Sequence, residues 1–190
     1  MDTDTLHAPA TGDDPEIATG RRLLVAGVAA AVAAAVAETS AALRGSGRTE
    51  LRWHEEWDDL EIGGTDRYEF SGDDVSVSAA PPGRSRATEP KKYRSPTLFA
   101  ALGDVTFEAA GNEDVDGVPT RHLRAASPED VDPTPLSFGL SHSGVTVAAL
   151  DVWVDDDDLV RRIDLSTTRD SAQDGHFVST FSIRLFDFGA

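Results

Sequence analysis

The chain has 190 residues and a mass of 20.2 kDa, which suits a single domain with an N-terminal extension. Hydrophobic residues make up 39% of the chain and charged residues 27%, the composition of a globular protein with a buried core. The formal net charge of -17 repels phosphate backbones and anionic membrane faces, so it argues against nucleic-acid binding. The absence of cysteine excludes disulfides, thiolate metal sites, thiol nucleophiles and lipid attachment through a cysteine.

The N-terminal part divides into two segments. Residues 1–20 are acidic and rich in Pro, Gly and Thr, and we expect this extension to be disordered. Residues 21–44 begin with the basic pair Arg21-Arg22 and continue with Leu23–Ala37, a run without a polar side chain. Two interpretations of this second segment are open.

In the first interpretation, residues 21–37 direct export or anchor the chain. A basic pair, an apolar run, and the small residues Ala35 and Ala37 before Glu38 follow the order of a signal peptide with its cleavage site. The run is short and alanine-rich for a membrane span. This interpretation predicts a protein of the cell envelope or a secreted protein, with the cytoplasm as the alternative location.

In the second interpretation, residues 21–44 are the first helix of the domain. Alanine is the best helix former, and such a helix would end at Gly45-Ser46-Gly47. Because the run carries no polar face, the helix would have to lie in a groove that covers most of its surface.

From residue 45 onward, apolar and polar residues alternate with the period of half-buried strands. Leu51, Trp53 and Trp57 share one parity, and Arg52, His54 and Glu56 share the other. The same alternation continues through residues 67–70, 75–79, 105–109, 118–124, 145–155, 159–165 and 177–185. Turns are expected at Gly63-Gly64, 71–73, Asp116-Gly117 and 156–158, and residues 127–135 read as a proline-rich linker.

One further short helix is expected between these strands. Ser95 is a suitable N-cap and Pro96 suits the first helical position, so the helix would run through Leu98, Phe99 and Leu102 to Gly103. The preceding residues 80–94 contain a basic cluster that we interpret as a solvated loop. Hairpins joined in series, with one or two helices, predict an antiparallel sheet in an α+β fold for residues 45–190.

A search for catalytic motifs finds none. No two of the five histidines (His7, His54, His122, His142 and His176) have a metal-binding helical spacing, and His54 and His122 fall on the polar parity of their strands as surface histidines. The acidic run Asp155–Asp158 reads as a solvated turn. Residues 141–144 lack the pattern of a nucleophile elbow, and no phosphate-binding loop is present. We therefore expect no enzyme activity, no cofactor and no metal.

The remaining candidate site is apolar. A curved sheet covered by few helices can leave a cavity that binds apolar ligands, although a packed core is the alternative interpretation of the same residues. The expected cavity-lining residues are Leu51, Trp53, Phe70, Leu98, Phe99, Leu102, Phe107 and Phe181.

Three segments together, Asp114–Arg124, Leu150–Leu165 and Leu185–Gly189, resemble in order and style the LppX/LprG-type actinobacterial lipoproteins, which resemble the lipoprotein carrier LolA in fold. The resemblance spans roughly Ala30 to the C-terminus. It implies an open antiparallel β half-barrel with one or two helices across its concave face. The lipidated cysteine of that family is missing, so this chain would be a non-lipidated member.

The resemblance also implies a function. The expected activity is non-catalytic binding or carriage of a lipid or acyl chain in the cell envelope, with an apolar small molecule or lipid as the partner and no nucleic acid. Membrane contact is expected only through the N-terminal apolar segment, if it is uncleaved. The alternative is an envelope sensor or protein-interaction domain without a small-molecule ligand.

Overall fold

The structure is a computed structural model that describes residues 28, 31–42, 44–57, 60–71, 74–79, 102–134, 144–171 and 175–188. The predictions for the acidic extension, for the basic loop of residues 80–94, and for Leu98 and Phe99 lie outside these residues.

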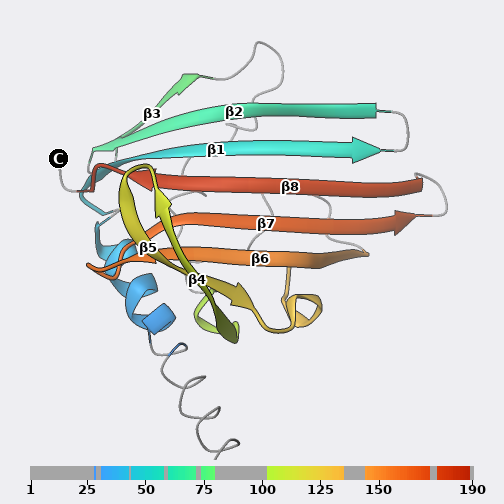
Figure 1. The fold of residues 1–190 in the computed structure, drawn as a ribbon. Helices are drawn as coiled ribbons and strands as arrows, with labels where there is room; N and C mark the ends of the chain where they lie inside the picture. Colours follow the sequence, from blue (N-terminus) through green and yellow to red (C-terminus); the bar gives the residue numbers. More distant parts are fainter. Residues whose placement is uncertain are drawn as a thin grey trace, which may run out of the picture.

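Eight strands form one open antiparallel sheet (Figure 1). The spatial order is β3-β2-β1-β8-β7-β6-β5-β4, so two meanders meet where the first strand pairs with the last. This confirms the predicted antiparallel sheet from residue 45 onward. The strands are β1 (Ser46–Trp57), β2 (Leu60–Ser71), β3 (Asp74–Ala79), β4 (Phe107–Val115), β5 (Val118–Ala125), β6 (Val145–Asp155), β7 (Val160–Ser171) and β8 (Gly175–Phe186).

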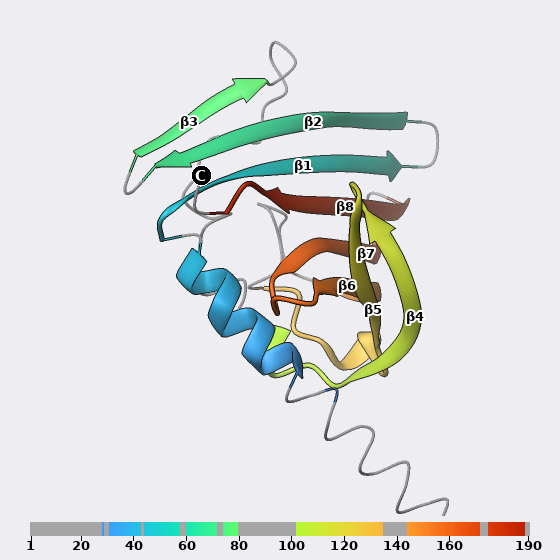
Figure 2. The same ribbon diagram turned by 60° about the vertical axis from the view of Figure 1, so that its left-hand side comes forward.

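A helix at residues 31–42 packs on one face of the sheet (Figure 2). Val32 and Ala35 are buried at 2% and 0% exposure, and the Thr39 hydroxyl accepts a hydrogen bond of 2.8 Å from the Val160 backbone N–H at the start of β7. We call this side of the sheet the helix face and the other side the opposite face. The fold is therefore α+β, an open half-barrel with a helix across its inner face, as the resemblance implied. Within the described part of the chain, no helix has the length and apolarity of a membrane span.

The core lies on the helix face, where the strand register aligns apolar side chains in rows. Leu51 and Trp53 of β1 pair with Ile183 and Phe181 of β8, and all four side chains are buried. Phe107 of β4 belongs to the same buried cluster. The period-two alternation thus placed the core-facing side chains of β1 and β8 correctly.

The predicted turn at Gly63-Gly64 is wrong, because both glycines lie inside β2. Gly64 pairs with Trp53, and a Cβ at Gly64 would approach the Trp53 indole to 3.0 Å. A Cβ at Gly63 would approach the Trp53 carbonyl oxygen to 2.9 Å. The two glycines therefore make room for the tryptophan and its strand instead of reversing the chain.

The β4–β5 hairpin crosses the other strands steeply and passes over the opposite face (Figure 1). Its turn is the predicted Asp116-Gly117 pair, with φ of 54° and 86°, and the Asp114 carboxylate accepts the Gly117 N–H at 2.6 Å. At the tip, Arg184 of β8 donates to Asp116 at 3.0 Å. After β5, part of the predicted linker forms a short 3-10 turn, η2 (Pro128–Asp130).

The prediction of a solvated turn at Asp155–Asp158 is wrong for its first residue. Asp155 is 3% exposed, and its carboxylate accepts the backbone N–H groups of Asp157 and Leu159 at 3.0 and 2.8 Å. Arg161 donates to the same carboxylate at 2.5 Å. A single buried acid therefore organises the β6–β7 turn, while Asp156 and Asp157 remain exposed.

Candidate functional site

The described members of the predicted ligand-binding set lie together on the helix face. All six side chains are 5% exposed or less, and they belong to one apolar cluster. Whether they contact a ligand stays a prediction. The six residues are Leu51, Trp53, Phe70, Leu102, Phe107 and Phe181.

Two apolar rows form the centre of this surface. Each row runs across β1, β8, β7 and β6, and the members of a row are joined by direct register pairs. Every residue of both rows is buried. The first row is Trp53, Phe181, Leu165 and Leu150, and the second is Leu51, Ile183, Ile163 and Val152.

A polar row borders the first apolar row, on the side away from the second. Glu55 pairs with Ser179, and Ser179 pairs with Thr167, so three neighbouring strands each contribute a polar side chain to the helix face. Their exposures are 1%, 0% and 1%. This polar row was not predicted from the sequence, although Ser179 shares the parity of Phe181 and Thr167 shares that of Leu165.

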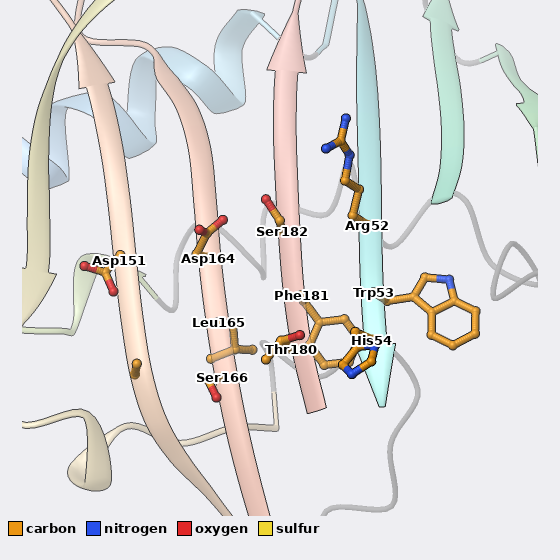
Figure 3. Close-up of a pocket in the computed structure, with 11 residues that line it drawn as sticks. Arg52, Trp53, His54, Asp151, Asp164, Leu165, Ser166, Thr180, Phe181 and Ser182 are labelled. Atoms are coloured by element: carbon orange, nitrogen blue, oxygen red, sulfur yellow. The ribbon is translucent and has the colours of Figure 1, made fainter. Parts of the chain in front are cut away.

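The opposite face has a different chemistry. A pocket of about 300 Å³ opens there between β1 and β6, and Figure 3 shows its lining residues with the helix behind the sheet. Its charged groups are engaged in ion pairs: Arg52 donates to Glu50 at 2.7 Å, and Asp164 accepts from Arg162 at 2.9 Å. The pocket lining also includes apolar residues, among them Trp53, Leu165 and Phe181, so charged groups in ion pairs and apolar groups meet there.

His122 is buried at 7% exposure beside this pocket, so the prediction of a surface histidine is wrong. Its Nε2 lies 2.6 Å from Asp151 and its Nδ1 lies 3.3 Å from Glu113. The ring stacks on Trp153 with centroids 4.4 Å apart, and the Trp153 indole N–H donates to Glu113 at 3.1 Å. The predicted polar parity of His122 holds, but neighbouring side chains of the hairpin and of β6 cover the ring.

The arrangement around His122 does not suit general-base catalysis. Both ring nitrogens face carboxylates, so neither is left to accept a proton from a nucleophile. Arg124 shares Asp151 with the histidine at 2.8 Å, and Arg162 lies over the Trp153 ring at 4.5 Å. The cluster therefore satisfies its own polar groups. Within the described ranges, no three His, Asp or Glu side chains are grouped so as to hold a metal ion.

Glu50 on β1 is another buried acid of the opposite face. Burial raises the pKa of its carboxyl, but hydrogen bonds from Arg67 at 2.8 Å and Arg52 at 2.7 Å outweigh that effect, and the pKa is lowered from its usual value. The carboxylate is therefore the favoured form, and it bridges two arginines on neighbouring strands.

A larger pocket of about 540 Å³ lies beside η2. Asp104, Asp130 and Asp132 contribute to its lining, and such a concentration of carboxylates is unsuited to an apolar ligand.

Comparison with known proteins gives similar folds at low sequence identity. No protein-family profile and no curated protein sequence matches the chain. The crystal structure of LprF from Mycobacterium bovis is similar at 14% identity, covering 84% of this chain and 93% of that chain, with a TM-score of 0.46. The lipoprotein LppX from Mycobacterium tuberculosis is similar at 14% identity, covering 82% of this chain and 93% of that chain, with a TM-score of 0.40.

A LolA superfamily protein from Nitrosomonas europaea is also similar, at 14% identity, covering 76% of this chain and 87% of that chain, with a TM-score of 0.24. The similar structures thus include the lipoprotein type that the sequence resembles and a protein of the LolA type, which those lipoproteins resemble in fold. The fold assignment itself rests on the strand order and register described above.

Proposed function

We propose that this protein binds an apolar ligand, a lipid or an acyl chain, on the helix face of its sheet and performs no catalysis on it. The observation that supports this is the pair of unbroken apolar rows across four central strands, which begin at Trp53 and Leu51. Acyl chains require apolar contact and no catalytic group, and each buried CH₂ contributes about 0.8 kcal/mol to binding.

The dimensions of this surface suit such a ligand. Strands are spaced about 4.8 Å apart, so a row across four strands is about 14 Å wide. The helix is fixed at one end of β7, where Thr39 contacts Val160, and the two rows cross β7 one after the other at increasing distance from that point, at Ile163 and then at Leu165. An acyl chain that lay along the strands would contact residues of both rows in succession.

The alternative function, a protein-interaction domain, predicts an exposed apolar patch. Among the described residues, Leu60 at 56% exposure is the exposed large hydrophobic side chain, and one such residue does not make a patch. The charged groups of the opposite face are largely engaged in ion pairs with one another. The apolar ligand therefore remains the better-supported function.

The proposed location is the cell envelope. The support is the basic pair Arg21-Arg22 followed by an apolar run. Val32 and Ala35 of that run belong to the core, so cleavage after Ala37 would remove two core residues. We therefore propose that the segment stays attached after any export.

The test uses two residues of β7 that face different sides. Ile163→Phe adds bulk to the second apolar row and lies outside the pocket lining, whereas Ser166→Phe adds the same ring to the pocket on the opposite face. Binding is measured by fluorescence of N-phenyl-1-naphthylamine, and native mass spectrometry of the purified protein detects a co-purifying lipid. We expect weaker probe binding in Ile163→Phe and unchanged binding in Ser166→Phe. The reverse result would place the site on the opposite face, and no binding at all by the native chain would contradict the proposal.

A further inference from the structure

We propose that Ser179 and Thr167 form the polar end of the ligand site and bind the uncharged head group of an amphiphile, one that carries hydroxyl or amide groups. This inference rests on the proposed function and specifies the class of ligand.

The two side chains are direct neighbours across a strand pair. Ser179 of β8 and Thr167 of β7 are register partners, and both point to the helix face beside the row of Phe181 and Leu165. In an antiparallel sheet, paired side chains on one face lie about 5 Å apart, so one head group can reach both hydroxyls.

Neither hydroxyl has a hydrogen-bond partner in the structure, although the two residues are only 0% and 1% exposed. Other buried threonines are satisfied: Thr39 accepts from the Val160 N–H, and Thr120 donates to the Glu113 carbonyl at 2.8 Å. Thr49 is also buried without a partner, but its register partners are Tyr68 and Leu185, so no second serine or threonine lies across either strand pair. An unsatisfied buried hydroxyl destabilises a fold, so two adjacent ones indicate groups that a ligand completes.

The surroundings favour an uncharged head group. A hydroxyl both donates and accepts, so a glycerol or amide head can satisfy Ser179 and Thr167 without bringing a net charge into a buried place. Glu55 is the register partner of Ser179 on its other side and is 1% exposed. A fatty-acid carboxylate bound here would lie next to that acid, and a cationic head group would lie near Arg169, which is on the same side of β7 and over the Phe177 ring.

The position along the strands also suits an amphiphile. Thr167 lies seven residues beyond Val160 on β7, where the helix is fixed by Thr39, and this separation corresponds to about 23 Å. A head group held at the polar row would leave its tail free to follow the apolar rows toward the helix.

The experiment compares 1-monolauroylglycerol with laurate, which share one acyl chain length and differ in the head group. Affinities are measured by displacement of N-phenyl-1-naphthylamine from the full chain, for the native protein and for Ser179→Ala, Thr167→Val and the double variant. Matched controls on the same strands, with side chains on the opposite face, are Ser182→Ala and Thr168→Val.

We expect the native chain to prefer the monoacylglycerol. Each substitution should weaken monoacylglycerol binding about three- to tenfold, as expected for the loss of one hydrogen bond, and should leave laurate and probe binding unchanged. The unfolding midpoint of each ligand-free variant should equal or exceed that of the native chain, because an unsatisfied group has been removed. The controls should leave affinity and selectivity unchanged.

The failures are distinguishable. A native chain that binds neither ligand nor the probe contradicts the proposed function as a whole. A native chain that binds both ligands equally, or a double variant that keeps its preference for the monoacylglycerol, overturns the head-group assignment and leaves the apolar site in place. If a variant has a lower unfolding midpoint and loses the same affinity for both ligands, the hydroxyls support the fold. That result also overturns the head-group assignment.

Discussion

The two faces of this sheet bury side chains by different means, although they share the same strands. On β8, Phe181 and Ile183 enter the helix-face core, while Ser182 and Arg184 point to the opposite face. Burial on the helix face is apolar and non-directional. The opposite face also buries charged groups. Each of these needs a hydrogen-bond partner, as in the contact between His122 and Asp151.

The buried polar side chains of the two faces differ in whether they have hydrogen-bond partners. On the opposite face, buried His122, Asp151 and Glu50 all have hydrogen-bond partners, while the buried Nε of Arg184 has none. On the helix face, Ser179 and Thr167 are buried without partners and are direct register neighbours. Two adjacent unpartnered hydroxyls therefore favour the helix face as the place of a ligand.

The largest expected contrast between the two faces is at neighbouring positions of β8. Phe181→Ala removes a ring that is 2% exposed and should lower the free energy of unfolding by about 3–5 kcal/mol. Thr180→Ala, on the exposed side of the same strand, should change it by less than about 0.5 kcal/mol. Urea denaturation followed by fluorescence measures both. Equal effects would contradict the assignment of the core to the helix face.

The next contrast concerns the helix itself. Deleting residues 1–20 should leave stability unchanged, because this acidic extension is expected to be disordered. Deleting residues 1–37 removes Val32 and Ala35 from the core and should lower stability by about 2–4 kcal/mol. Thermal unfolding compares the two truncations.

N-terminal sequencing of protein recovered from the envelope and from the cytoplasm gives a second measurement. A stable mature chain that starts at Glu38 would contradict the structural role of the helix. An intact, purely cytoplasmic chain would contradict export.

A third experiment tests whether the opposite face depends on its polar partners. Asp151→Ala leaves buried His122 without its 2.6 Å partner and should lower stability by about 1–3 kcal/mol. The control Asp164→Ala removes a more exposed acid paired with Arg162 and should have an effect below about 1 kcal/mol. If Asp151→Ala leaves stability unchanged, the polar cluster around His122 contributes little to folding. The two faces of the sheet would then differ less than proposed.

The predictions from sequence succeeded where one periodicity dominates. Leu51, Trp53 and Phe181 were assigned to the covered face because alternation along a strand fixes which side chains share a face. The Asp116-Gly117 turn was recognised for a similar reason, since its residue types suit positive φ angles. Both features are local, and local features can be read from a short stretch of sequence.

The errors came from contacts between distant segments. Gly63-Gly64 was taken for a turn because its true cause, the Trp53 indole on the next strand, is a cross-strand contact. His122 was taken for a surface residue because parity does not report that Trp153 covers it. Ser179 and Thr167 were overlooked because a hydroxyl becomes informative only when its burial and its lack of a partner are known.

The smallest expected effect is the pH dependence that Glu50 contributes on the opposite face. Its pKa in the folded protein is lowered from 4.5, since hydrogen bonds from Arg67 and Arg52 outweigh burial, so its contribution to stability is fully present above that value. The contribution is lost as the pH falls through the lowered folded-state pKa. Glu50→Gln should therefore destabilise the protein at pH 7 by less than about 1 kcal/mol, because both arginines are half exposed and solvent screens the pairs. The difference from the native chain should shrink as the pH is lowered below 4.5. Urea midpoints at a series of pH values measure this, with Glu69→Gln on the exposed side of β2 as the control. A Glu50→Gln difference that persists undiminished at the lowest pH would show that the side chain acts through packing and not through its charge.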